Sequence, residues 1–233
     1  MAGADRSGPR VWITRAQPGA DRTADALTAR GFTPVVTPLI ALEPLDTPLD
    51  LTGVAGLAFT SRNGVAAFAA RTPGRDWPVF TVGDATADAA RDHGFAEVRS
   101  AGGALDDLAA LIAGAWAPAD GLILVPGPRE PAGDLAGLLS GRVAVRPLPL
   151  YAAIDTDVAP PGDFDTVLVH SPRAARILAA RLSPGEARGR LLVAISAAAA
   201  APLNGTGFAE IRIAARPTGE SLLEALGNPV RPV

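Results

Sequence analysis

The chain lacks several of the side chains on which common catalytic sites depend. It contains no cysteine and no lysine, so all 21 of its basic residues are arginines. The absence of cysteine excludes disulfides, thiolate nucleophiles and cysteine-ligated metals, and the absence of lysine excludes Schiff-base chemistry. Only two histidines are present, His93 and His170, which argues against a zinc site. Any charged side chain that binds an anion here must be an arginine.

Charge and hydropathy exclude further functions. A net charge of −3 gives no overall basic surface that would indicate nucleic acid binding. The first residues, MAGADRSGPR, lack the apolar run of a signal peptide, and the longest apolar run, LLVAISAAAAAPL, is too short and too rich in alanine to cross a bilayer. We therefore expect a soluble, cytoplasmic protein that binds neither membrane nor nucleic acid.

Three common glycine motifs are also missing. The sequence contains no G-x-G-x-x-G, no G-x-x-x-x-G-K-[ST] and no G-x-S-x-G. A dinucleotide-binding fold, a P-loop enzyme and an α/β-hydrolase therefore lose support.

Short β-branched runs alternate with segments of helical period along the whole chain. A strand is predicted at Val11–Arg15, followed by a helix over residues 21–30 that Gly31 ends. Similar pairs continue to the last predicted helix, GESLLEAL. Strands that alternate with helices of this length predict an α/β fold with parallel sheets.

The sequence also repeats itself at a spacing of about 110 residues. GFAEVR at Gly94–Arg99 recurs as GFAEIR at Gly207–Arg212, and Ser61 in FTSRNG has a counterpart in Ser171 of VHSPRA. TPLIAL and LPLYAA stand at the same spacing. These pairs indicate a duplicated α/β unit.

Two proline-rich extended segments occupy equivalent places in this repeat, as linkers would. Proline disfavours helices and central strands. We therefore predict two Rossmann-like or flavodoxin-like parallel-sheet domains joined by two extended linkers at 38–41 and 148–152. One domain would be discontinuous, formed by 1–37 and 153–233, because 1–37 is too short to fold alone. The other domain would comprise 42–147.

Several strand-to-helix corners are candidate anion sites. In an open parallel sheet, ligands bind outside the carboxyl ends of the strands, where helix N-termini present free N–H groups. Ser61 and Ser171 fit N-cap positions, and Gly64 would let a ligand approach the backbone. Further corners are expected at Gly83 with Thr86, at Ser196, and in VPGPRE. A capping serine has an ordinary structural explanation, so the prediction depends on several corners in two domains facing one cleft.

Two other residues invite a functional interpretation. Tyr151 is the only tyrosine and lies in the second predicted linker. It could serve packing alone, or it could be a proton donor, since a phenol with a pKa near ~10 is protonated at neutral pH. His170 directly precedes Ser171, but neighbouring residues on a strand point to opposite faces, which argues against a Ser–His pair.

An ordered set of segments resembles the uroporphyrinogen-III synthase family. It comprises WITRAQPGADRTADALTARGFTPVVTPLIAL, FTSRNGVAAF, FTVGDATADAARDHGF, PLPLYAAI, HSPRAARIL and GFAEIRIAARPTGESLLEAL. The resemblance implies a two-domain α/β architecture with paired linker strands. It implies that linear hydroxymethylbilane is closed to uroporphyrinogen III, with loss of water and inversion of the last pyrrole ring, a lyase reaction. It further implies a monomer without metal or organic cofactor, supplied by hydroxymethylbilane synthase as upstream donor.

The resemblance also assigns residues. Tyr151 corresponds to the family's cleft tyrosine, which is proposed to assist departure of the hydroxyl. The substrate-binding loops would include Arg15, Thr60, Ser61, Arg62, Asn63, Gly64, Gly83, Asp84, Ala85, Thr86, Gly127, Arg129, Ser171 and Ser196. One segment departs from the family: where members often carry a Gly-Pro-Thr-Thr type loop, this chain has SAAAA at Ser196–Ala200.

Two alternatives remain open at the level of sequence. A non-catalytic tetrapyrrole or small-molecule sensor of the same fold would suit the missing threonines, whereas the retained Tyr151 argues against it. A periplasmic-type binding protein is disfavoured by the absence of a recognisable signal peptide.

Overall fold

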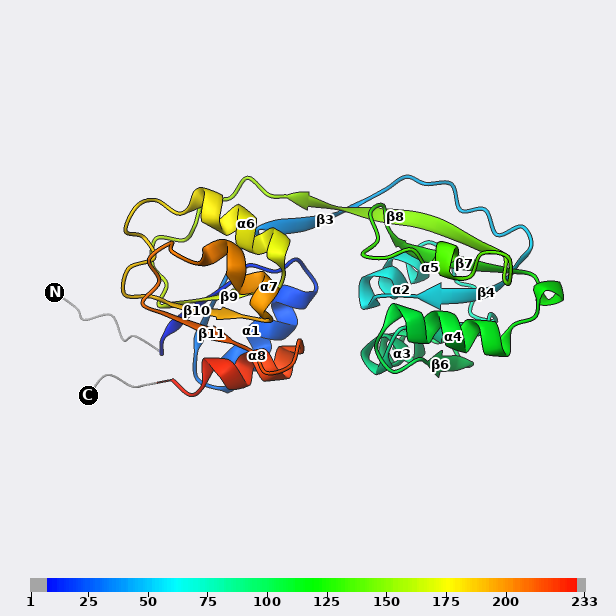
Figure 1. Cartoon of the computed structure of the whole chain (residues 1–233), viewed down its shortest axis with the longest axis horizontal. Coiled ribbons are helices and arrows are strands. Elements are labelled where there is room, and N and C mark those ends of the chain that lie inside the picture. The colour runs from blue at the N-terminus through cyan, green and yellow to red at the C-terminus, as the bar shows by residue number, and fades with distance from the viewer. Residues whose placement is uncertain (1–7, 230–233) are drawn as a thin grey trace. The chain divides into compact units, whose positions relative to one another are not determined.

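The computed structural model describes residues 8–229, which form two compact α/β units (Figure 1). Residues 8–42 and 154–229 make the discontinuous unit, and residues 43–153 make the central unit. The chain therefore passes from one unit to the other after Leu42 and again after Ala153.

The discontinuous unit is built on a five-stranded parallel sheet. Its strands are β1 (Arg10–Ile13), β2 (Thr33–Val36), β9 (Thr166–Val169), β10 (Leu191–Ala194) and β11 (Glu210–Ile213). They lie in the order β11-β10-β9-β1-β2. The strand pairs are all parallel, with Trp12 opposite Val167 and Val193 opposite Leu168, for example.

Helices cover both faces of this sheet. They are α1 (Gly19–Ala29), α6 (Pro172–Arg181), α7 (Ala197–Ala200), the 3₁₀ turn η2 (Ala201–Leu203) and α8 (Gly219–Leu226). Successive strand residues alternate between two cores. Trp12 packs in a cluster with Leu178 of α6 and Leu203, whereas Ile13 packs in a cluster with Leu27 of α1 and Leu222 of α8. Because both faces are covered, the strands are apolar at nearly every position.

The central unit is built on a six-stranded sheet in the order β3-β8-β7-β4-β5-β6, of which β3 and β8 run across the unit boundaries after Leu42 and Ala153. Its strands are β3 (Ile40–Pro44), β4 (Val54–Phe59), β5 (Val79–Thr81), β6 (Val98–Ser100), β7 (Leu122–Pro128) and β8 (Val145–Asp155). Its helical segments are α2 (Arg62–Ala69), α3 (Asp84–Asp92), α4 (Leu105–Ala115), η1 (Pro118–Asp120) and α5 (Leu135–Leu138).

This sheet is also covered on two faces. Ala58, Phe80 and Ile123 pack in a cluster with Leu108 and Ile112 of α4. On the other face Phe59 makes ring contacts with Phe68 of α2 and with Phe95, at centroid distances of 6.0 Å each. The two α/β units with parallel sheets confirm the predicted fold class.

The two sheets share one topology. The order β11-β10-β9-β1-β2 in one unit corresponds to β6-β5-β4-β7-β8 in the other. In each sheet the order in which the chain adds strands reverses between two inner neighbours. These are β9 and β1 in the discontinuous unit and β4 and β7 in the central unit. The correspondence places Ser171 after β9 and Ser61 after β4, in agreement with the internal repeat seen in the sequence.

The proline-rich segments contribute strands, β2 and β3 in the first and β8 in the second. Pro147 and Pro149 lie within β8, which runs between β3 and β7. A proline removes a donor but keeps its carbonyl, and carbonyls of β8 accept hydrogen bonds from the neighbouring segments. The carbonyl of Leu150 accepts from the Leu45 N–H at 2.8 Å, and that of Pro149 accepts from the Thr47 hydroxyl. An inner strand can therefore tolerate these prolines.

Candidate functional site

The corner after β4 is an N-capped helix start. Ser61 has extended backbone angles, φ −158° and ψ 154°, and its Oγ accepts a hydrogen bond from the Gly64 N–H at 3.1 Å. This is the geometry that an N-cap serine requires. The sequence predicted this cap, and the structure confirms it.

Tyr151 reaches the same serine from β8. Its phenolic oxygen lies 3.1 Å from Ser61 Oγ, and the residue is only 7% exposed. Burial raises the pKa of Tyr151, while the hydrogen bond with Ser61 acts in the opposite, lowering direction. A raised pKa keeps the phenol protonated at neutral pH, so Tyr151 can donate a hydrogen bond or a proton there.

A break in strand register precedes this tyrosine. Gly127 of β7 lies opposite Pro149, but the next residue, Pro128, lies opposite Tyr151, so Leu150 is an additional residue on β8. An additional residue of this kind redirects the side chains that follow it. Leu150, Tyr151 and Ala152 are consequently all buried, instead of alternating between two faces.

A hollow of about 280 Å³ lies beside the tyrosine. We call it the Tyr151 hollow; its lining residues are Thr60, Ser61, Val82, Leu105, Pro128, Pro131, Ala132, Gly133 and Tyr151. Its walls come from the chain that leaves β4 and the chain that leaves β7. These neighbouring strands flank the point where the strand order reverses, which is where open α/β sheets bind ligands.

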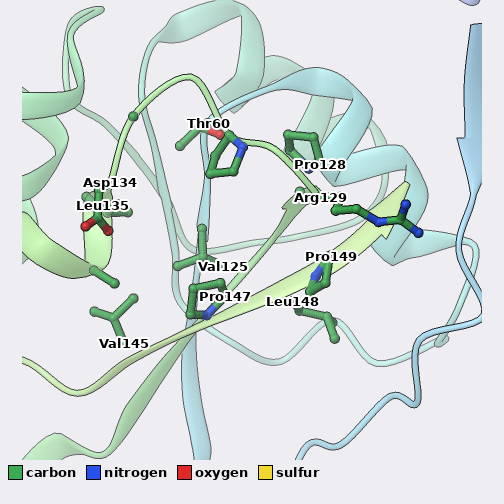
Figure 2. A pocket seen from close by; sticks show the side chains of 14 residues that line it. Thr60, Val125, Pro128, Arg129, Asp134, Leu135, Val145, Pro147, Leu148 and Pro149 are labelled. Carbon is green, nitrogen blue, oxygen red and sulfur yellow. The ribbon is translucent and has the colours of Figure 1, made fainter. Parts of the chain in front are cut away.

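A second, smaller hollow of about 130 Å³ shares Thr60, Pro128, Pro131 and Gly133 with the first. We call it the Arg129 hollow (Figure 2). Val125, Val145, Leu135 and several prolines give it a mostly apolar wall, with Asp134 and Arg129 as its charged members. Figure 2 shows the Arg129 side chain on the opposite side from Leu135.

The VPGPRE segment differs from its prediction as a strand-to-helix corner. β7 continues through Pro128, and the Arg129 N–H donates to the Tyr151 carbonyl at 2.7 Å. The helix that follows, α5, begins only at Leu135 and has four residues. Gly127 and Arg129 therefore lie on a strand end and a loop, and not at a helix N-terminus.

Gly64, where the sequence predicted that a ligand could approach the backbone, packs closely against β7. It is buried, and a Cβ built on it would lie 2.6 Å from the carbonyl oxygen of Pro126. No side chain fits between the helix and β7 at that distance. The absence of a side chain at this position brings α2 close to the sheet. Its neighbours Arg62 and Asn63 begin α2 and are partly exposed.

The corner after β5 is capped by backbone alone. Gly83 is the N-cap of α3, and its carbonyl accepts from the Thr86 N–H at 3.0 Å. Thr86 is buried, whereas Asp84 and Ala85 are exposed. The Asp84 carboxylate already complements the positive end of this helix, which makes the corner less favourable for a substrate carboxylate.

Three predicted site residues belong to the discontinuous unit. Ser171 caps α6 by accepting from the Ala174 N–H at 3.1 Å, and Ser196 caps α7 by accepting from the Ala199 N–H at 3.3 Å. Arg15 follows β1, and a Cβ built on Gly19 would lie 2.6 Å from its Nε. The α7 helix has only four residues, so its dipole contributes little.

His170 lies at the switch point of the same unit. Both of its ring nitrogens are buried without a hydrogen-bond partner among the described residues. Burial, and then the positive charge of Arg15, lower the pKa of His170 to about 3. The ring is therefore neutral at ordinary pH and is not a general acid there.

The structure thus brings together only part of the predicted set. Thr60, Ser61 and Tyr151 line the Tyr151 hollow, and Thr60, Gly127 and Arg129 line the Arg129 hollow. Sequence reasoning missed the apolar and loop residues of these walls, Val82, Leu105 and the segment 131–133. These residues carry no charged or hydroxyl side chain that would have marked them as part of a site, and contacts between segments far apart in the chain bring them to the hollow.

Metal clusters and membrane-spanning helices are absent from the part of the chain that the structure describes. No group of three or more acidic or histidine side chains within residues 8–229 could hold a metal ion. No helix in the same range is long and apolar enough to cross a membrane.

Comparison with known proteins gives a consistent result. The chain resembles the solved uroporphyrinogen-III synthetase of Helicobacter pylori, with 18% identity over 93% of this chain and 97% of that one, at a TM-score of 0.65. It also resembles a mutant uroporphyrinogen III synthase of Thermus thermophilus, with 16% identity over 93% and 96% of the two chains, at a TM-score of 0.52. At these identities the likeness establishes the fold. A comparison with curated protein sequences finds no match.

Family assignment comes from the sequence itself. Residues 21–224, most of the chain, match the family described as Uroporphyrinogen-III synthase HemD. The match covers strands and helices of both units. It includes the strand-to-helix corners at Ser61 and Ser171, and Tyr151 of β8. The chain therefore belongs to the uroporphyrinogen-III synthase family.

Proposed function

We propose that the chain converts hydroxymethylbilane to uroporphyrinogen III, with Tyr151 as the proton donor to the departing hydroxyl. The observation that carries this assignment is the buried, protonated phenol of Tyr151 at the wall of a hollow at the switch point of its sheet. Membership of the uroporphyrinogen-III synthase family supplies the reaction class.

The reaction needs little acid–base catalysis by the protein, because the substrate itself supplies the electrons. The C–O bond of the terminal hydroxymethyl group breaks as the adjacent pyrrole nitrogen supplies electrons, and the oxygen leaves as water after it takes up a proton. The resulting methylene carbon bonds to the carbon of the last pyrrole that already carries its bridging methylene. That older C–C bond then breaks and re-forms at the free carbon on the other side of the pyrrole nitrogen, which inverts the ring. This carbon finally releases a proton, so that bonds and protons balance. The net result is the elimination of water, which makes the enzyme a hydro-lyase. The main contribution of the protein is to orient a flexible substrate, an effect of proximity.

Binding of the substrate carboxylates would involve backbone and arginine donors. The N-terminal turn of α2 presents N–H groups next to the Tyr151 hollow, and Arg129 lies beside the Arg129 hollow. We propose Arg15, Ser171 and Ser196 as further contacts from the discontinuous unit. The segments Thr60–Asn63, Gly83–Thr86 and Gly127–Arg129 complete the proposed set. The predicted monomeric state, cytoplasmic location and supply by hydroxymethylbilane synthase stay predictions.

The test is a direct assay of product and isomer. Freshly prepared hydroxymethylbilane is added to the purified chain, and the porphyrin isomers are separated after oxidation. We expect the type III isomer, at a rate that rises in proportion to protein concentration, and only the non-inverted isomer with heat-inactivated protein. Retention of hydroxymethylbilane without type III product would overturn the proposal and favour the non-catalytic binding protein.

A further inference from the structure

Ser61 Oγ takes part in two hydrogen bonds at once. It accepts from the Gly64 N–H at 3.1 Å and pairs with the Tyr151 hydroxyl at 3.1 Å. A serine hydroxyl has one proton and two lone pairs. Once the Gly64 N–H occupies one lone pair, the bond to Tyr151 uses either the serine proton or the second lone pair. These two arrangements leave the phenolic proton in different places.

The start of α2 favours the arrangement in which Ser61 donates its proton to Tyr151. The first turn of α2 carries the positive end of the helix dipole and an N–H group aimed at Ser61 Oγ. A hydroxyl in that field orients its hydrogen away from the helix, and here the partner on that side is Tyr151. Acceptance from Gly64 also polarises the serine O–H and makes it a stronger donor, as in other chains of hydrogen bonds.

We propose that Ser61 is a positioning residue, which donates its proton to the Tyr151 oxygen and so leaves the phenolic O–H free to point into the Tyr151 hollow. The catalytic part of this inference rests on the proposed function, whereas the direction of the hydrogen bond does not. Ser61 would act on the reaction through Tyr151, besides the substrate contact proposed for its segment.

Among the described residues, the wall of the hollow beside the Tyr151 phenol contains no charged side chain that would compete with Ser61 for it. The residues that line the Tyr151 hollow are all uncharged, so no ionised wall residue competes for the phenolic proton. Burial is the main cause of the raised Tyr151 pKa, and the Ser61 hydrogen bond is the opposing one. A bond that Ser61 donates stabilises the phenolate, and one that Tyr151 donates stabilises the phenol. If Ser61 donates to the Tyr151 oxygen, removal of the serine hydroxyl takes a donor away from the phenolate and should raise the pKa of Tyr151.

The chain contains a matched control for the cap. Ser171 is the N-cap of α6 and has φ −160° and ψ 154°, close to the −158° and 154° of Ser61. Its Oγ accepts a hydrogen bond from the Ala174 N–H at 3.1 Å, the same distance as between the Gly64 N–H and Ser61 Oγ. Its replacement removes an equivalent helix cap without removing the hydroxyl next to Tyr151.

The experiment is a titration of Tyr151 in the intact protein. Because the chain has one tyrosine, the phenolate absorbance, or the signal of isotope-labelled tyrosine, reports this residue alone. We expect Ser61→Ala to raise the pKa of Tyr151, Ser61→Thr to restore it, and Ser171→Ala to leave it unchanged. Ser61→Gly provides a second variant, because glycine is well tolerated at an N-cap; circular dichroism confirms folding throughout the titration.

Turnover gives the catalytic readout. Loss of one neutral hydrogen bond should reduce kcat roughly three- to tenfold in Ser61→Ala with little change in KM. The same change in a Tyr151→Phe background should have almost no further effect. A Tyr151 pKa that falls or stays constant in folded Ser61→Ala and Ser61→Gly would overturn the inference. If no variant, wild type included, forms type III product, the proposed function fails, while the titration still tests whether the Ser61 hydroxyl stabilises the Tyr151 phenolate.

Discussion

Gly64 of α2 lies so close to Pro126 of β7 that a Cβ on Gly64 would stand 2.6 Å from the Pro126 carbonyl oxygen. The obstacle is backbone, which cannot move aside as a flexible side chain can. This contact sets how closely α2, and with it the Ser61 cap, approaches the strand that leads to Pro128 and Arg129. A helix start that forms part of the candidate site is therefore held by the packing of a glycine.

Gly64→Ala should destabilise the fold before it affects substrate binding. Overpacking of this kind costs about 1–3 kcal/mol, so the midpoint of thermal unfolding should fall clearly. Gly127→Ala is the matched control, because nothing lies within 4 Å of the Cβ it would add. It should unfold near the wild-type temperature but raise KM, since the methyl group would enter the Arg129 hollow. A Gly64→Ala protein of unchanged stability and weaker substrate binding would support the ligand-approach interpretation instead.

Tyr151→Phe should lower turnover without changing the isomer formed. The substrate's own pyrroles drive hydroxide departure, so the phenol is a supplement. Loss of its hydrogen bond is expected to cost roughly tenfold or less in kcat. The ratio of type III to non-inverted product should stay high, because orientation of the substrate selects the isomer. A folded Tyr151→Phe protein that is inactive, or that releases mainly the non-inverted isomer, would make Tyr151 an indispensable acid.

His170 should make stability depend on pH below neutrality. Its folded-state pKa of about 3 lies below its usual value of 6.5, so between these values the unfolded chain binds a proton that the folded chain does not. Stability should therefore fall as pH decreases from 6.5, with a slope approaching about 1.4 kcal/mol per pH unit from this one residue. Denaturant unfolding at about pH 6.5 and about pH 5 measures the slope.

A histidine variant isolates the effect. His170→Leu should flatten the pH dependence of the unfolding free energy in this interval. Equal slopes in wild type and His170→Leu would show that His170 is not held neutral in the folded state.

Arg75 should be a structural arginine that lysine cannot replace. Its guanidinium donates to the carbonyls of Thr72, Gly74, Ala69 and His93 and lies 5.0 Å from the centre of the Phe95 ring. The compact ammonium of lysine cannot serve several separated acceptors at once. Arg75→Lys should cost about 2 kcal/mol or more, from two or more lost hydrogen bonds.

An exposed arginine gives the comparison for Arg75. Arg91 pairs with Asp88 at 2.9 Å on the surface of α3, and exposed pairs contribute about 0–1 kcal/mol. Arg91→Lys should therefore change the unfolding free energy little. Similar losses in the two variants would point to a general cost of removing arginine and against a specific role of Arg75.

The sequence by itself determined the periodic features of this protein. The alternation of strands and helices, the repeat at about 110 residues and the caps at Ser61 and Ser171 are local patterns, and local hydrogen bonding and burial enforce them wherever the chain lies. The lack of cysteine and lysine and the presence of only two histidines also limit the possible catalytic groups. This limit holds in any fold, because it depends on composition alone.

Only the tertiary structure decided how these parts meet. The additional residue at Leu150, which directs Tyr151 towards Ser61, depends on pairing between β7 and β8 and leaves no periodic signature. Pro147 and Pro149 indicated an extended linker, and only the structure shows that this segment pairs as an inner strand whose carbonyls bond its neighbours. The close packing of Gly64 on Pro126 likewise has no signal in the sequence. In each case the deciding contact joins residues far apart in the chain, and its energy exists only once the sheet has formed.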